Sequence, residues 1–207
     1  MEAALGAGAA IFNAGRYHAA HDAWEDYWLD LESGTEDERF LHGLIQFTAA
    51  VHHATNRNWS GATGLAESAV EYLDGLNDTY RDVNIGEIRD YLRTLAADPE
   101  VIERHDPPRM RIDGTVIRLE DLDLQATIAA AHVYAEADGY DAALIDRAAD
   151  LTDPNIEDGG DSVIISLLFD FVRKPNRRDL IYERLGAHVE RQEARASDVD
   201  GLFESND

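Results

Sequence analysis

Apolar residues recur at the spacing of an α-helix through most of this chain, and that period limits the folds it can adopt. The segment 36–56 shows it most clearly, because Phe40, Leu44, Phe47 and Val51 fall on one narrow stripe of a helix. The same period predicts further helices over 3–13, 17–31, 60–76, 84–97, 121–137, 140–149, 162–172 and 177–196. Short connections favour antiparallel neighbours. The expected fold class is all-α, a bundle of antiparallel helical hairpins with a C-terminal helical extension.

Local signals refine this outline. Thr35 followed by Glu38 has the spacing of a capping box and opens the helix over 36–56, and Ser60 is the expected N-cap of the next helix. Asp113-Gly114 lies between two β-branched runs, which predicts a short β-hairpin near 110–119. We therefore expect a helical core over 1–105, a linker with the hairpin over 106–123, and a helical extension over 124–207 that packs on the core.

The charge of the chain is its strongest global signal. The net charge is −24 at pH 7, from 42 acidic against 18 basic residues, and the only lysine is Lys174. Acidic residues are spread along the whole chain, as in halophilic proteins that work in molar salt, where their mutual repulsion is screened. We expect an acidic, halophilic, archaeal-like protein. The alternative is an acidic surface that recruits a basic partner.

Several functional classes can be excluded from composition. A nucleic-acid-binding role is not expected, because phosphate binding needs a basic surface. The absence of cysteine removes disulfide frameworks and thiolate chemistry. The chain has no apolar run of membrane-spanning length and no signal-peptide pattern, so we expect a cytoplasmic protein without a membrane partner.

Polar residues form a second stripe on two successive helices. On the helix over 17–31 the stripe holds His18, His21, Glu25 and Trp28. On the helix over 36–56 it holds His42, Gln46, Ala49 and His53. Because a short loop joins these helices, we expect the two stripes to face each other.

Three interpretations of the facing stripes remain open. The first is a divalent-metal site with His21, Glu25, His42 and His53 as ligands, since imidazole and carboxylate one turn apart can chelate an ion. The second is a metal-free acid–base site with His21, Glu25 and Gln46. The third, which we favour, is a buried hydrogen-bond network that needs no metal or other cofactor.

Aromatic residues beside the stripes are candidates for a ligand pocket. Trp24, Trp28 and Trp59, together with His53, could bind a small molecule, although aromatic residues at helical spacing more often pack in a core.

A longer pattern connects these residues to a known family. The segment FNAGRYHAAHDAWEDYW, followed by LHGLIQFTAAVHHATNRNWSGATGLAESAVEYL, resembles the domain-of-unknown-function family 309 over residues 10–75. The resemblance is carried by Phe12, Asn13, Gly15, Tyr17, Ala20, His21, Glu25, Trp28, Gly43, Leu44, Ile45, Gln46, His53, Asn58, Gly61 and Ala62. It implies a compact all-helical fold and assigns no activity. It also implies that His21, Glu25, Gln46 and His53 belong to one site.

Hairpins of helices and a long C-terminal helix are typical of modules that bind partners. Ile181, Leu185 and Val189 form an apolar stripe on that helix, which could pack within the chain or against a second copy. Our first expectation is a partner-binding or scaffolding module, acting with a protein partner or as a homo-oligomer. The alternatives are a metal-dependent or acid–base hydrolase using His21, Glu25, Gln46 and His53, and a small-ligand binder. Whether the chain is an enzyme stays open.

Overall fold

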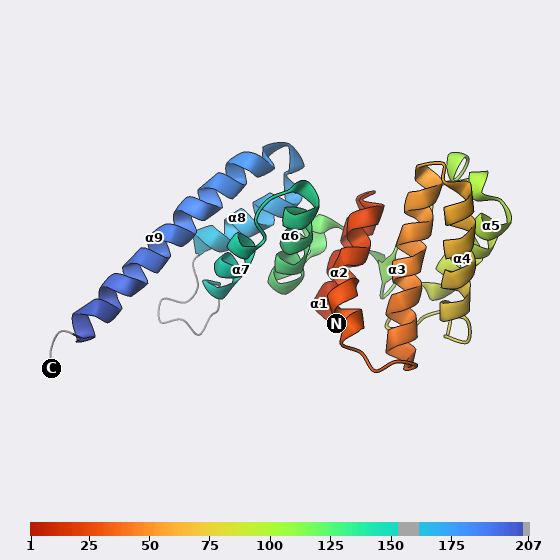
Figure 1. Ribbon diagram of the computed structural model, residues 1–207, viewed down its shortest axis with the longest axis horizontal. Helices are drawn as coiled ribbons and strands as arrows, with labels where there is room; N and C mark the ends of the chain where they lie inside the picture. Colours follow the sequence, from red (N-terminus) through yellow and green to blue (C-terminus); the bar gives the residue numbers. More distant parts are fainter. Residues whose placement is uncertain (153–161, 205–207) are drawn as a thin grey trace. The chain divides into compact units, whose positions relative to one another are not determined.

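The computed structural model describes residues 1–152 and 162–204, and the chain divides into two compact units, Met1–Ala129 and Ala130–Asp207 (Figure 1). The first unit contains five α-helices, a short 3-10 helix and a two-stranded sheet: α1 (Glu2–Asn13), α2 (Tyr17–Leu29), α3 (Glu36–Thr55), α4 (Trp59–Leu73), α5 (Ile85–Ala97), η1 (Pro99–Glu103), β1 (Arg111–Ile112) and β2 (Thr115–Val116). It continues through η2 (Leu119–Asp121) into α6 (Leu124–Asp138), inside which the boundary falls. The all-α fold class with one short β-hairpin is confirmed.

Successive helices of the first unit pack against one another, from α1 to α5. The apolar stripe of α3, Phe40, Leu44, Phe47 and Val51, is 0% exposed, as its period predicts. On α3, Gly43 faces α4 so closely that an added Cβ would lie 2.5 Å from side-chain atoms of Leu73. Close packing of α3 between its neighbours is what brings the polar stripes of α2 and α3 into one seam.

Of the two N-cap residues predicted from the sequence, the structure confirms one and contradicts the other. The Thr35 hydroxyl accepts a hydrogen bond from the Glu38 amide at 3.2 Å, so the predicted cap of α3 is confirmed. The N-cap of α4 is Asn58, whose side-chain oxygen accepts from the Gly61 amide at 3.2 Å, and the prediction of Ser60 is wrong. Arg57 has a φ of 58°, a left-handed conformation that an α-helix cannot continue through. The next helix begins two residues later, at Trp59, so Ser60 already lies in its first turn.

The predicted hairpin is present and forms part of the first unit. Arg111 pairs with Val116 and Ile112 with Thr115. Asp113 and Gly114 both have positive φ, 49° and 71°, as a tight two-residue turn between antiparallel strands requires.

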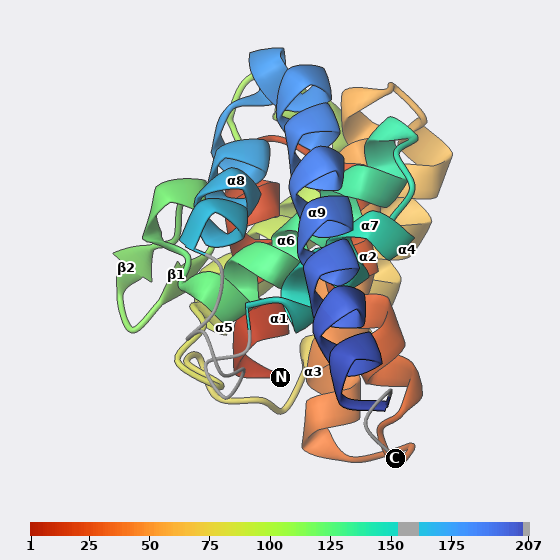
Figure 2. The ribbon, with the colours of Figure 1, turned by 90° about the vertical axis from the view of Figure 1, so that its left-hand side faces the viewer.

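The second unit is helical as well. Beyond α6 it holds α7 (Ala143–Asp150), α8 (Ser162–Arg173), η3 (Pro175–Arg177) and α9 (Arg178–Glu204), and Figure 2 shows the length of α9 along its own unit. Ile181, Leu185 and Val189 are buried, and α9 contacts α7 and α8, so this apolar stripe packs within the chain. No helix in the described part of the chain is long and apolar enough to cross a membrane.

Candidate functional site

The polar seam between α2 and α3 has two distinct ends. We call the "histidine end" the group His18, His21, Asp22 and Glu25 of α2 with His52 of α3. The "tryptophan end" comprises Trp28 of α2, Glu38, His42 and Gln46 of α3, and Tyr72 of α4. The two helices contact each other and are joined by a short loop, so the start of α2 lies beside the end of α3 (Figure 1).

At the histidine end, His21 is held by its own helix. Its Nδ1 lies 2.5 Å from the carbonyl oxygen of His18, and because a carbonyl can only accept, Nδ1 carries a proton and donates it. Nε2 lies 2.9 Å from Asp22 Oδ1 and 3.8 Å from Glu25 Oε2. A lone pair facing a carboxylate at this distance would be repelled. Nε2 therefore shares a positive species with Asp22, either a second proton or a cation.

The charges of the neighbouring imidazoles differ. The pKa of His21 is raised, chiefly by its hydrogen bond to Asp22, against the opposing effect of burial. The His18 ring stacks on both His21 and His52, with centroids 5.0 Å apart in each pair. The pKa of His52 is lowered by burial and by the positive charge that His18, His53 and His21 would carry. A proton in this group therefore resides on His21 in preference to His52.

His53 lies in the last turn of α3, next to the connection to α4. Its Nδ1 is 2.7 Å from Asn58 Nδ2, and a Cβ added at Gly61 would lie 2.9 Å from the same ring nitrogen. His53, Asn58 and Gly61 thus fit together only because position 61 has no side chain. Their shared contact holds the turn in place.

The tryptophan end is a hydrogen-bonded cluster centred on Glu38. Trp28 Nε1 donates to Glu38 Oε1 at 2.9 Å, and the Gly34 amide donates to Oε2 at 3.2 Å. His42 Nδ1 lies 3.5 Å from Oε1. The pKa of Glu38 is lowered, first of all by the hydrogen bond from Trp28. The carboxylate is therefore negatively charged, and each of its two oxygens accepts a hydrogen bond.

His42 is enclosed by aromatic rings on both sides. Its ring centroid lies 4.5 Å from that of Trp28 and 3.8 Å from that of Tyr72, on which it stacks. Gln46 Nε2 is 3.4 Å from His42 Nε2. An open groove of about 630 Å³ borders this cluster, with Trp28, His42, Tyr72 and Ser68 among its lining.

The structure thus distributes the predicted site residues over three places. His21 and Glu25 lie together at the histidine end, His42 and Gln46 lie together at the tryptophan end, and His53 lies in the last turn of α3 with Asn58.

The three tryptophans also have separate environments. Trp24 is 1% exposed, packs against Gly8 of α1 and donates from Nε1 to the Ala4 carbonyl at 3.0 Å. Trp28 lines the groove, and Trp59 is the half-buried first residue of α4.

Glu38 and Asp22 are among the seam residues that sequence reasoning missed, along with His52 and Tyr72. Glu38 was recognised only as a partner of the Thr35 cap, although its position four residues before His42 also places it on the polar stripe. Asp22 lies about 100° around the helix from His21, so helical periodicity gives no signal for it. Its carboxylate nevertheless lies 2.9 Å from the His21 ring.

The histidine end has the donors for a metal ion. In the described part of the chain, His21, Asp22 and Glu25 each offer one ligand atom, and these atoms lie within 4.8 Å of one another. Imidazole combined with carboxylates suits zinc and other divalent transition metals.

Comparisons with known proteins relate the N-terminal part of the chain to others of unknown function. Residues 5–65 match the sequence model of the family described as Domain of unknown function (DUF309), which confirms the resemblance found from the motif. The chain is also 27% identical over 100 residues to an uncharacterized protein of Aquifex aeolicus (strain VF5). That alignment covers 48% of this chain and 29% of the relative, so the chain spans less than a third of the relative's length.

Proposed function

We propose that the histidine end binds one divalent transition-metal ion through His21, Asp22 and Glu25. The observation that carries the proposal is the orientation of His21. Its Nδ1–H is fixed on the His18 carbonyl, which directs Nε2 at two carboxylates 2.9 and 3.8 Å away. Histidine ligands of metals are commonly oriented in this way, by donating the other ring N–H to a backbone carbonyl or carboxylate.

The three donors also suit the charge of an ion. Two carboxylates and one neutral imidazole provide two negative charges, which balance a divalent cation. The Glu25 side chain is 51% exposed, so the metal would be reached directly from solvent.

Three protein ligands leave coordination positions for water or a substrate. Such open sites are the ones that hydrolytic enzymes use, because the bound water becomes a stronger nucleophile. If the protein is an enzyme, we propose that it is a metal-dependent hydrolase. In that case His21 acts as a metal ligand and not as a general base.

The test is calorimetric titration of Zn²⁺ and Mn²⁺ into the full chain, purified without chelators and held in KCl. We expect one equivalent to bind to the wild type and none to His21→Gln. The matched control is His132→Gln, because His132 also faces two carboxylates, Glu136 at 3.9 Å and Asp146 at 3.6 Å. A wild type without stoichiometric binding, or a His21→Gln variant that binds like the control, contradicts the proposal.

A second candidate function is the partner-binding module. The C-terminal turn of α2 supports it, because Tyr27 is 38% and Leu29 66% exposed, large apolar side chains on one short segment. Affinity purification from a native lysate at high salt should return a partner with the wild type and lose it with Leu29→Asp. Equal recovery with both, or no partner with either, counts against this function.

A further inference from the structure

A second polar site lies between the end of α1 and the β-hairpin, away from the α2–α3 seam. Asn13, the last residue of α1, is buried and joins the two segments. Its Nδ2 donates to the Met110 carbonyl at 2.8 Å and to the Ile117 carbonyl at 2.9 Å, and its Oδ1 accepts from the Met110 amide at 2.8 Å. One side chain thus fixes both strands of the hairpin, just before β1 and just after β2.

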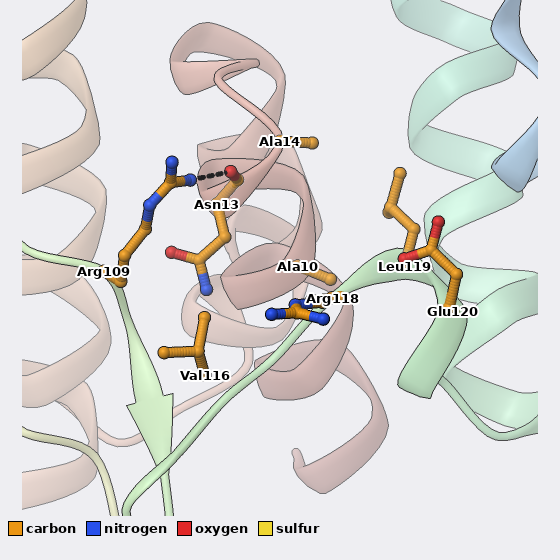
Figure 3. A pocket seen from close by; sticks show the side chains of 8 residues that line it. All are labelled: Ala10, Asn13, Ala14, Arg109, Val116, Arg118, Leu119 and Glu120. Carbon is orange, nitrogen blue, oxygen red and sulfur yellow. Dashed lines mark hydrogen bonds between the residues drawn. The ribbon is translucent and has the colours of Figure 1, made fainter.

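This anchor positions two arginines. Arg109 precedes the bonded Met110 and Arg118 follows the bonded Ile117, so each side chain emerges beside Asn13. Together they line a cavity of about 460 Å³. Figure 3 shows both arginines among the residues that line the cavity, with Arg109 donating to the Asn13 carbonyl.

Within the described part of this acidic chain, these two arginines lack the carboxylate partner that many basic side chains have. Many other basic side chains of the described residues form ion pairs with carboxylates, for example Arg111 with Glu87 at 2.8 Å and Arg89 with Asp78 at 2.6 Å. No ion pair among the described residues involves Arg109 or Arg118. Two guanidinium groups without a carboxylate partner among the described residues thus line one cavity.

We propose that this cavity binds a small organic carboxylate between Arg109 and Arg118. A guanidinium group presents parallel N–H donors that match the two oxygens of a carboxylate. Glu120 also lines the cavity, and its carboxylate repels a doubly charged phosphate more strongly than a monoanion. Ala10, Val116 and Leu119 supply apolar lining for a short aliphatic tail.

The test is a titration of the ¹⁵N-labelled full chain with butyrate and, separately, with inorganic phosphate, followed by NMR. It is run at the lowest KCl concentration at which the wild type is folded, since salt screens these contacts. The variant is Arg118→Gln. The matched control is Arg111→Gln, which removes the same charge from the same hairpin at a residue outside the cavity lining. Equal melting temperatures of the two variants show that the hairpin is intact.

We expect saturable butyrate shifts at Ala14 and Arg118, weaker binding of phosphate, a loss of roughly tenfold or more in affinity for Arg118→Gln, and a change within about twofold for Arg111→Gln. Absence of saturation in the wild type, an equal loss in both variants, or tighter binding of phosphate than of butyrate would overturn the proposal.

Discussion

The two ends of the α2–α3 seam contain the same pair of residue types at the same spacing, but they differ in how far the glutamate is buried. Each has a histidine and a glutamate four residues apart, His21 with Glu25 and Glu38 with His42. Glu38 is only 13% exposed and accepts from an indole and a backbone amide, whereas Glu25 is 51% exposed.

Two physical differences separate the ends. Glu38 lies in the first turn of α3, where the helix dipole stabilises a negative charge. Tyr72 of α4 also stacks on His42, so a third helix completes the tryptophan end. The histidine end is built from α2 and α3 alone. The two ends thus differ in how their glutamate is held: Glu38 is hydrogen-bonded and nearly buried, and Glu25 is half exposed.

Salt should produce the largest effect, because it acts on the whole chain. The net charge of −24 repels itself in dilute buffer, so we expect the melting temperature to rise steadily from dilute buffer to molar KCl. Thermal melts followed by circular dichroism measure this. A melting temperature that does not rise would refute the halophilic interpretation of the composition. The variants at the two ends would then be compared in dilute buffer instead of molar KCl.

Removing a carboxylate should have very different costs at the two ends. Glu38→Gln leaves the Trp28 and Gly34 donors without their charged acceptor, and we expect it to lower the free energy of unfolding by about 1–3 kcal/mol. The matched change Glu25→Gln, at an exposed position, should cost within about 0.5 kcal/mol. Denaturant unfolding in KCl measures both. Equal costs would mean that the ends do not differ in the way proposed.

The smallest effect concerns the proton on His21. Its folded pKa is raised above the unfolded value, so the stability it contributes is present below the unfolded pKa and is lost as the pH rises through the folded pKa. Asp22→Asn removes the main cause of the shift and should lower the pKa of His21, measured by NMR titration of its ring protons. Asp26→Asn, an exposed change on the same helix, is the control. An unchanged pKa in Asp22→Asn would show that Asp22 is not the partner of Nε2.

Much of the fold could be predicted from the sequence. The helices, the cap at Thr35 and the turn at Asp113-Gly114 follow from local rules of period and backbone conformation. The prediction of Ser60 as the N-cap was wrong because α4 begins at Trp59, with Asn58 as its cap, directly after the left-handed Arg57. The spacing of apolar residues does not locate the start of a helix to within one or two residues.

The candidate site was less predictable than the fold. Periodicity placed His21, Glu25, His42, Gln46 and His53 on two stripes, and the structure brings them together only in pairs or with other partners. Asp22 escaped prediction because its contact depends on a side-chain rotamer instead of its place on the helix.

The sequence by itself determined which residues share a helix face, because that depends only on the rise and rotation of the backbone. Only the tertiary structure decided which faces are covered. Tyr72, thirty residues beyond His42 in the chain, stacks on it at one end of the seam, and Asn13 brings Arg109 and Arg118 to one cavity from across the hairpin. These contacts depend on how helices and strands pack across large sequence separations, which no local pattern encodes.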